Sequence, residues 1–259
     1  MKNDLSFTIP DDDTVFSPAN IFRHLVKKKH PSVGLPRFCI ISYLTSVRSH
    51  IQRNLSPVAY NSLHQGHPYF VFQWKNDKVA FQLLPIGAPA AGMMIEEAIA
   101  LGTDQFLFLG SAGVLDERIP PGTLVLPTSA LCDEGTSSHY LPGNPLGYPD
   151  PELFGRLQNL LRQNGLDYRL GKTWTTDAPY RETPRKIRKA LREGCVTVDM
   201  EASALFTIST YHQKKMAGIF IAADVVTEHG WMPRKPIGNE FDLSRLLMTV
   251  ADLALESGE

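Results

Sequence analysis

The feature that most constrains the fold is the alternation of short apolar runs with amphipathic stretches along the chain. Apolar runs bounded by turn residues are typical of buried strands, and amphipathic stretches are typical of helices that cover a sheet. Two of the runs are predicted to pair as a hairpin through Asn76 and Asp77. The predicted strands cover residues 38–41, 69–72, 79–84, 106–109, 123–126, 169–174, 196–198 and 218–223. The alternation predicts a layered α/β fold.

The predicted helices begin and end at capping residues. Asp150 precedes the stretch 151–164, a proline opens that stretch, and Gly165 follows it. A polar cap, an early proline and a closing glycine are typical of a helix. Further predicted helices cover residues 90–101, 184–193 and 243–255. No internal repeat or low-complexity linker interrupts the pattern, so we predict a single domain over residues 1–259.

The charge and the cysteines exclude several classes of protein. A formal net charge of −1 gives no broad field for nucleic acid or an anionic membrane, and the basic cluster 27–30 is interpreted as a solvated helix face. The widely spaced Cys39, Cys132 and Cys195 have no metal-ligand spacing and fit a reducing compartment. Residues 1–13 lack the order of a signal peptide, and no apolar run reaches the length of a membrane span. We expect a cytoplasmic protein without a metal, membrane or nucleic-acid partner.

Two carboxylates flank a methionine at a predicted junction between a strand and a helix. Asp199, Met200 and Glu201 follow the apolar run 195–198 and lead into a helical pattern that ends near His212. Open α/β sheets bind ligands at such junctions. A carboxylate can accept two hydrogen bonds from a diol, and a thioether packs well under an apolar ring face. The alternative is a helix start at which acidic side chains favour the positive end of the dipole.

Glycines follow two of the predicted strands. Residues 110–113 read Gly-Ser-Ala-Gly after the strand 106–109, and residues 87–89 read Gly-Ala-Pro before a predicted helix. Glycine lets the backbone approach a ligand closely, and exposed amides with the Ser111 hydroxyl can hold an anion. The alternative is a turn that needs glycine for its own conformation.

Aromatic, basic and acidic side chains follow two further strands. Within residues 175–183, the Tyr180 ring could stack on a heterocycle and Arg181 could donate to a carbonyl or ring nitrogen. The alternative is a capped loop whose polar side chains bond nearby amides. Asp224 ends the apolar run 219–223, where a partly shielded carboxyl group is suited to general acid catalysis. Its alternative is a structural cap.

Taken in order, these segments resemble the nucleoside phosphorylase and nucleosidase superfamily over roughly residues 69–224. The family's glycine-rich turn before a proline matches residues 87–89, and its Gly-Ser/Thr-x-Gly loop matches 110–113. Its base-side segment matches 176–180, and its Glu-Met-Glu-Ala/Ser signature matches 199–202. The resemblance implies a three-layer α/β/α sandwich with a mixed central sheet.

The resemblance also implies a role for each segment. Asp224 would protonate the leaving base, with phosphate as co-substrate and no cofactor or metal. The family assembles as dimers or hexamers, which implies a homo-oligomer. The residues implied are Asp199, Met200 and Glu201 for the ribose, Ala112, Gly113, Asp177, Pro179, Tyr180 and Arg181 for the base, and Gly87, Gly110 and Ser111 for phosphate.

The chain departs from the family at the phosphate-binding residues. Phosphorylases carry a Gly-Asp-Pro-x-Arg turn near the N-terminus, where residues 16–21 here read Phe-Ser-Pro-Ala-Asn-Ile. Phe108 stands where they place an arginine before the Gly-Ser/Thr-x-Gly loop, and residues 64–67 contain no arginine. Arginine forks hold a phosphate dianion best, so Arg48 and Arg53 are candidates to substitute.

Three functions fit these residues. The favoured one is phosphorolysis of a ribonucleoside, and Asp224 favours a purine. The first alternative is hydrolysis, as in the methylthioadenosine/adenosylhomocysteine nucleosidases, although their Gly-Ala-Met-x-x-Glu turn is missing. The second is nucleoside binding without turnover, which would not need Asp224. Residues 137–149 are predicted to form a long surface loop, and residues 225–236 either a mobile lid or an ordered loop.

Overall fold

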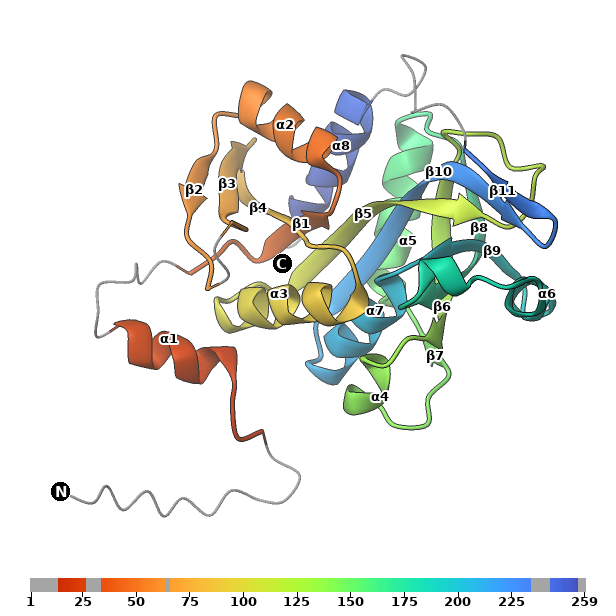
Figure 1. The fold of residues 1–259 in the computed structure, drawn as a ribbon. Helices are drawn as coiled ribbons and strands as arrows, with labels where there is room; N and C mark the ends of the chain where they lie inside the picture. The colour runs from red at the N-terminus through yellow and green to blue at the C-terminus, as the bar shows by residue number, and fades with distance from the viewer. Residues whose placement is uncertain (1–13, 27–33, 64–65, 234–242, 256–259) are drawn as a thin grey trace, which may run out of the picture.

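The computed structural model describes residues 14–26, 34–63, 66–233 and 243–255 and shows one mixed sheet with flanking helices (Figure 1). The strands are β1 (Phe38–Ser42), β2 (Val58–Tyr60), β3 (Tyr69–Trp74), β4 (Asp77–Leu83), β5 (Gln105–Val114), β6 (Leu124–Asp133), β7 (Leu146–Gly147), β8 (Tyr168–Thr176), β9 (Cys195–Asp199), β10 (Lys215–Thr227) and β11 (Gly230–Met232). The helices are α1 (Pro18–Val26), α2 (Thr45–Asn54), α3 (Ala88–Ala100), α4 (Ser137–Tyr140), α5 (Pro151–Gln163), α6 (Pro184–Arg192), α7 (Ala202–Tyr211) and α8 (Leu243–Ala251).

The sheet has an open arm and a closed part. The arm runs from β5 through β1, β4 and β3 to β2, and the predicted β3–β4 hairpin is confirmed. The closed part is a circuit of pairings, because β5 pairs with both β9 and β10, and β6 and β8 complete the ring. Strands β1, β4, β5 and β10 are parallel neighbours, so their carboxyl ends lie at one edge of the sheet.

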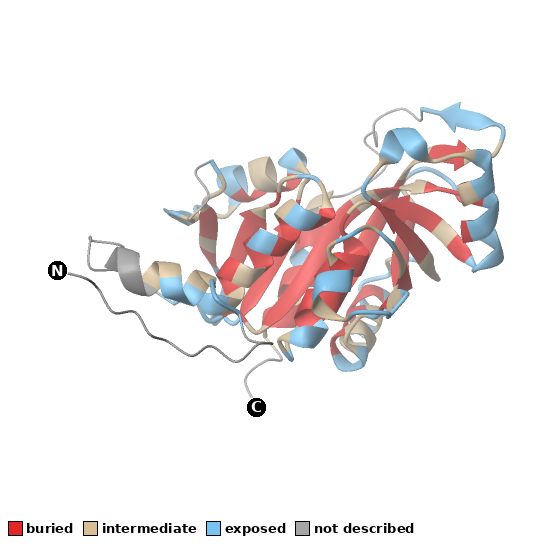
Figure 2. Ribbon diagram, turned by 60° about the horizontal axis from the view of Figure 1, so that its bottom comes forward, coloured by how far each residue is buried: buried red, intermediate tan, exposed pale blue. Residues whose placement is uncertain are grey.

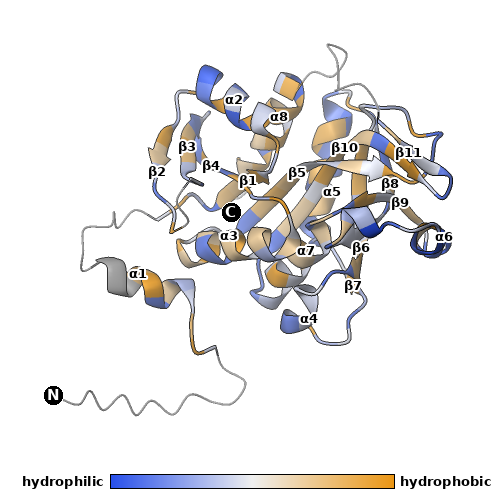
Figure 3. Cartoon of the chain, in the orientation of Figure 1, coloured by the Kyte–Doolittle hydropathy of each residue, from blue (hydrophilic) through white to orange (hydrophobic). Residues whose placement is uncertain are grey.

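Helices cover both faces of the sheet, as alternate residues of β1 show. Phe38 and Ile40 pack in a cluster with residues of α2, α5 and α8, whereas Cys39 and Ile41 pack in a second cluster with α3 and α7. This alternation follows from the two-residue period of a strand. The strands are buried between the helices in Figure 2, and the central strands are mainly hydrophobic in Figure 3, whereas α6 is hydrophilic. The predicted three-layer α/β/α fold is confirmed.

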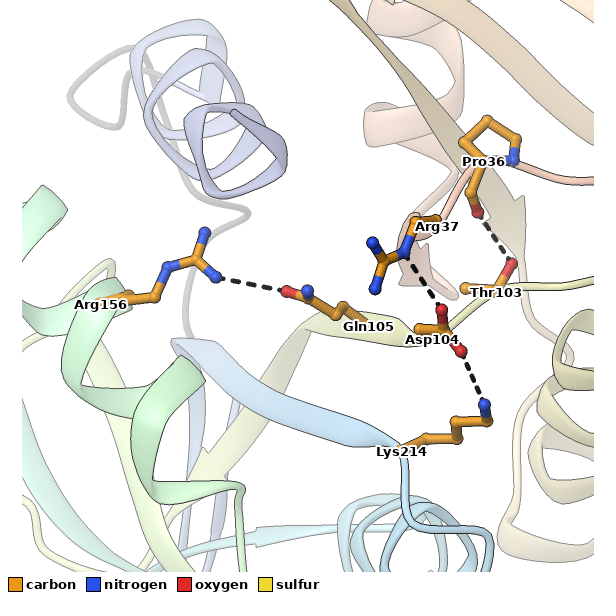
Figure 4. A network of polar contacts seen from close by, with 7 residues as sticks. All are labelled: Pro36, Arg37, Thr103, Asp104, Gln105, Arg156 and Lys214. Carbon is orange, nitrogen blue, oxygen red and sulfur yellow. Dashed lines mark hydrogen bonds and ion pairs between the residues drawn. The ribbon is translucent and has the colours of Figure 1, made fainter. Parts of the chain in front are cut away.

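Charged side chains join the amino-terminal ends of the central strands (Figure 4). Arg37 and Lys214, which precede β1 and β10, bind the Asp104 carboxylate at 3.2 and 2.6 Å. Arg156 of α5 donates to Gln105 at 3.3 Å. The charged groups at this end of the sheet bind one another, and the predicted site residues follow the carboxyl ends of strands, at the opposite edge.

Two segments differ from their prediction because strand pairing extends further than the glycine pattern suggests. Residues 110–113 were expected to form a glycine-rich loop after their strand but belong to β5, in which residues 110–112 pair with β10 and Gly113 pairs with β9. Asp224 was expected at the end of its strand, but β10 continues to Thr227. Hydrogen bonds to two neighbours outweigh the low strand preference of glycine.

Four shorter elements also differ from prediction. The expected loop 137–149 contains the short helix α4 and the strand β7, which pairs with β6. Residues 225–232 complete β10 and form β11, so this part of the expected lid or loop is a β-hairpin. Strand β2 was not predicted, since three partly exposed residues carry little periodic signal.

Several predictions concern residues outside the described ranges. They are the acidic segment 1–13, the basic cluster 27–30, residues 64–65, and residues 234–236 of the expected lid. Within the described ranges, no helix is long and apolar enough to cross a membrane.

Candidate active site

The Asp199 carboxylate is buried at the junction between β9 and α7, where four donors bind it. Its Oδ1 accepts hydrogen bonds from the hydroxyls of Thr173 at 3.1 Å and Thr175 at 2.7 Å. Its Oδ2 accepts from the amides of Glu201 at 2.9 Å and Ala202 at 2.6 Å. Burial raises the pKa of Asp199, and the four donors oppose that rise. With both oxygens occupied, Asp199 shapes the junction, and we expect it to support a ligand-binding residue instead of reaching the ribose itself.

The Glu201 carboxylate lies beside the loop that follows β4. Only 1% of Glu201 is exposed, and its Oε1 accepts a hydrogen bond from the Gly87 amide at 2.7 Å. Gly87 has a φ of 104°, a conformation that side chains other than glycine rarely adopt. Burial raises the pKa of Glu201 to about 8, and the negative charge of Asp199 adds to the rise. The glycine at 87 therefore lets a backbone amide reach a buried carboxylate.

Tyr43, which the sequence analysis missed, joins this group at the carboxyl end of β1. Its hydroxyl donates to the Ser111 carbonyl and lies 3.0 Å from Ser111 Oγ, and it accepts from the Ser111 amide at 2.8 Å. Burial and then the charge of Glu201 raise the pKa of Tyr43, which places the phenol within electrostatic reach of that carboxylate. Only its position directly after a buried strand could have indicated Tyr43 as a site residue, because none of the recognised motifs includes it.

The glycines at 110 and 113 leave room for their neighbours. A Cβ at Gly110 would lie 3.3 Å from the Tyr43 ring, and one at Gly113 would lie 3.0 Å from a Val198 methyl group. Such contacts are tighter than ordinary packing allows. The two glycines therefore let β5 pass close to Tyr43 on one side and to β9 on the other.

Asp224 lies at an irregularity in the pairing of β10 with β5. Ala222 is opposite Ala112 and Val225 is opposite Val114, so three steps along β10 match two along β5. A bulge of this kind redirects side chains, and such bulges are common beside active sites. The Asp224 side chain is partly buried, and its Oδ2 accepts a hydrogen bond from the Trp231 indole at 2.5 Å.

A second carboxyl group, that of Glu182 in the loop before α6, lies within electrostatic reach of Asp224. Burial raises the pKa of Glu182 to about 7, and the charge of Asp224 adds to the rise, while Lys186 lowers it. The Lys186 ammonium in turn binds Asp133 at 2.8 Å. Glu182 was not predicted as a site residue, because its approach to Asp224 depends on how two distant loops pack.

The segment expected to bind a base is exposed. Pro179, Tyr180 and Arg181 form one turn of 3-10 helix, and the Tyr180 side chain is fully exposed. Asp177 is also exposed and accepts a hydrogen bond from the Gly135 amide at 2.9 Å. Residues 177–181, which follow β8, form an exposed rim of the candidate site. A ligand could reach them without rearrangement of the core.

The two arginines considered for phosphate lie on α2, which follows Tyr43. Arg53 donates through Nε to the Ser49 carbonyl at 3.1 Å, within its own helix. The Arg48 Nε is buried and has no hydrogen-bond partner among the described residues. Arg48 is therefore the better placed of the two to bind an anion near the carboxyl end of β1.

A cavity of about 960 Å³ lies to one side of these residues. Pro89 and Asp177 border it, and the rest of its wall comes mainly from α1, α3, α4 and α7. Glu201, Ser111 and Asp224 do not line it. The cavity therefore does not coincide with the polar residues described above. In the part of the chain that the structure describes, no three His, Cys, Asp or Glu side chains form a metal-binding group.

Comparison with known proteins identifies the family. A sequence model of the phosphorylase superfamily matches residues 44–252. This chain belongs to that superfamily.

The similar proteins include several nucleoside phosphorylases at low identity. The uridine phosphorylase of Thermococcus kodakarensis is 27% identical over 164 residues, 58% of this chain and 59% of the relative. The guanosine phosphorylase of Halorubrum lacusprofundi is 27% identical over 124 residues, 48% of this chain and 52% of the relative. The match to these two relatives thus spans little more than half of their length. A DeoD-type purine nucleoside phosphorylase of Exiguobacterium sibiricum is 25% identical over 171 residues, 64% of this chain and 72% of the relative.

A solved structure resembles the whole fold. The AMP nucleosidase from Bacteroides thetaiotaomicron VPI-5482 superposes with a TM-score of 0.73 at 18% identity, covering 94% of this chain and 100% of that one. At this identity the likeness concerns the fold alone. The chain is thus an α/β protein of the phosphorylase superfamily with a cluster of carboxylates at the carboxyl edge of its sheet.

Proposed function

We propose that the protein cleaves the N-glycosidic bond of a purine ribonucleoside and transfers the ribosyl group to phosphate. One observation carries the proposal: the segment 110–113 of β5 lies between β10, which bears Asp224, and β9, which leads into Glu201. Neighbouring strands lie about 5 Å apart, so the two strands that lead to these carboxyl groups are separated by roughly 10 Å, a span that a nucleoside can bridge.

Glu201 is the proposed ligand of the ribose hydroxyls. Its carboxylate is held by the Gly87 amide, and Met200 beside it is partly exposed and can pack against the sugar. The Asp199 carboxylate accepts a hydrogen bond from the Glu201 amide and so fixes the backbone of Glu201. A preorganised carboxylate binds a diol with little loss of side-chain entropy.

Asp224 is the proposed acid. Its proton passes to a nitrogen of the departing base, and the electron pair of the C1′–N bond goes to the base as that bond breaks. A phosphate oxygen then bonds to C1′, giving ribose 1-phosphate, the free base and the Asp224 carboxylate. Protonating the leaving group lowers the barrier because a neutral base departs more easily than its anion.

Support for phosphate as the acceptor comes from the phosphorylase relatives and from Arg48, whose buried Nε has no partner among the described residues. Hydrolysis is the second candidate. It is favoured by the Tyr43 hydroxyl, which occupies both the amide and the hydroxyl of Ser111, groups that would otherwise be open to an anion.

The two candidates are separated by measuring base release from purine and pyrimidine ribonucleosides, with methylthioadenosine included, in the presence and absence of phosphate. Phosphate-dependent release with ribose 1-phosphate as product is the expected result. Release without phosphate, with free ribose as product, would assign hydrolysis. Binding without release would leave a nucleoside-binding protein.

The ribose assignment is tested by Glu201→Ala on ribosides and on their 2′,3′-dideoxy analogues. We expect kcat/KM to fall about 10-fold for the riboside, the effect of a lost hydrogen bond to a neutral group, and much less for the analogue. Equal losses on both substrates would remove Glu201 from the ribose site.

Two properties of the whole protein are proposed on the family resemblance. One is a homo-oligomer, a dimer or hexamer, which light scattering after size-exclusion chromatography tests. The other is a cytoplasmic location, tested by cell fractionation.

A further inference from the structure

The hairpin formed by β10 and β11 carries an exposed tryptophan, Trp231. Val225 pairs with Met232, and Val226 pairs with Trp231. All of β11 is exposed, as Figure 2 shows, and 61% of Trp231 remains accessible. A single exposed ring is common on protein surfaces, so any role of Trp231 has to be argued from the contacts that it makes.

The Trp231 side chain points back to Asp224. Asp224 precedes Val226 by two positions, so it shares a face of the hairpin with Trp231 as a diagonal neighbour, a distance that long side chains can span. The indole N–H reaches the Asp224 Oδ2 at 2.5 Å. An indole nitrogen only donates, so the bond engages one carboxyl oxygen and leaves Oδ1 to face a ligand.

The hairpin is also anchored to the body of the protein. Glu228, at its turn, binds Arg188 of α6 at 2.6 Å. Within the turn, Thr227 Oγ1 accepts from the His229 amide and donates to the Gly230 carbonyl, both at 3.3 Å. The hairpin that carries Trp231 is thus bound to α6 through its turn.

We propose that Trp231 is a positioning residue for Asp224, and this inference rests on the proposed glycosidic cleavage. The indole holds Oδ2, so the proton that reaches the base leaves from Oδ1. When that proton has moved to the base nitrogen, Asp224 is a carboxylate. A hydrogen bond to a carboxylate is about twice as strong as one to a neutral acid. The Trp231 N–H therefore stabilises the transition state more than the bound substrate, which raises kcat without tightening binding.

The test is Trp231→Phe, which keeps an aromatic ring and removes the N–H. On a purine riboside we expect kcat to fall about 10- to 100-fold, as for loss of a hydrogen bond to a charged group, with KM changed less than about 3-fold. On p-nitrophenyl riboside, whose leaving group departs without protonation, kcat should stay within about 2-fold, because the acid is no longer needed. A role confined to holding the hairpin in place would lower both rates alike.

Met232→Leu on the same hairpin is the matched control and should leave both rates unchanged. The urea midpoint of each variant confirms that the fold is intact. Equal losses on the two substrates, or no loss on either, would overturn the positioning role while leaving the proposed function standing. A wild-type protein that cleaves neither substrate would overturn the proposed function and this inference with it.

Discussion

The two halves of the candidate site differ in how completely their polar groups are satisfied. The buried half comprises Tyr43, Gly87, Ser111, Asp199 and Glu201, and its hydrogen bonds are made within the protein. The exposed half comprises residues 177–181, Asp224 and Trp231; the Tyr180 and Trp231 rings are exposed, and Asp224 is partly buried. Buried polar groups must be paired to be tolerated, whereas exposed ones are free to be paired by a ligand. Under the proposed function, the buried half would hold the ribose, which all ribonucleosides share, and the exposed half would distinguish their bases.

The largest expected effect concerns catalysis in the exposed half. Asp224→Asn keeps the shape of the side chain but removes the proton that the base receives. We expect kcat to fall about 10²- to 10⁴-fold, the usual contribution of a general acid. Steady-state rates on a purine riboside measure it, with Asp167→Asn at an exposed site as the control. Unchanged turnover would remove Asp224 from the mechanism.

A substitution in the buried half should lower the free energy of unfolding. Asp199→Ala strands the donors that its carboxylate now accepts, among them the hydroxyls of Thr173 and Thr175. Each buried donor left without a partner costs about 1–3 kcal/mol, so we expect the free energy of unfolding to drop by about 3 kcal/mol or more. Urea denaturation measures it. Asp177→Ala, which removes one exposed acceptor, should cost less than about 1 kcal/mol. Similar losses in both variants would contradict the contrast between the halves.

The pH dependence of stability tests the burial of Glu201. Its pKa is about 8 in the folded protein against an ordinary 4.5, so the native state retains a proton that the unfolded chain has released. The free energy of unfolding should therefore fall as pH rises from about 4.5 to about 8. Glu97 and Glu182, with pKa values raised to about 7, add to this fall with the same sign.

Glu201→Gln should make that fall shallower, by at most about 1.4 kcal/mol per pH unit, the limit for one proton. Urea titrations at pH 5, 6, 7 and 8 measure the slope, with the exposed Glu193→Gln as the matched control. Parallel slopes for the wild type and Glu201→Gln would show that this carboxyl group is not buried as described.

The smallest expected effect concerns the rim. Tyr180 is fully exposed, so Tyr180→Ala should change the free energy of unfolding by less than about 0.5 kcal/mol. Loss of ring stacking should raise KM for a purine riboside about 2- to 10-fold. Tyr148→Ala, at an exposed tyrosine outside the site, is the control. An unchanged KM would exclude Tyr180 from base binding.

Local patterns predicted the elements of this fold well. The helix over Pro151–Gln163 begins where expected, with Asp150 accepting the Leu153 amide at 2.8 Å, because a cap needs only neighbouring residues. The junction of Asp199, Met200 and Glu201 was likewise found where β9 meets α7, since a change of period marks it. Both features depend on interactions within a few residues.

Features that depend on distant pairing were not predicted. The glycines of residues 110–113 indicated a loop after the strand 106–109, but pairing with β9 and β10 extends the strand through them. The bulge beside Asp224 exists only relative to the register of β5. Tyr43 meets Ser111 from 68 positions away, and no local pattern carries that contact. The residues that complete the site were therefore visible only once the sheet was assembled.

The most direct test of one shared site is a crystal structure of the Asp224→Asn variant with a purine ribonucleoside bound. The ribose hydroxyls are expected at the Glu201 carboxylate and the base beside position 224, with the nucleoside lying across residues 110–113 of β5. A nucleoside seated instead in the 960 Å³ cavity between α1, α3, α4 and α7 would contradict the account.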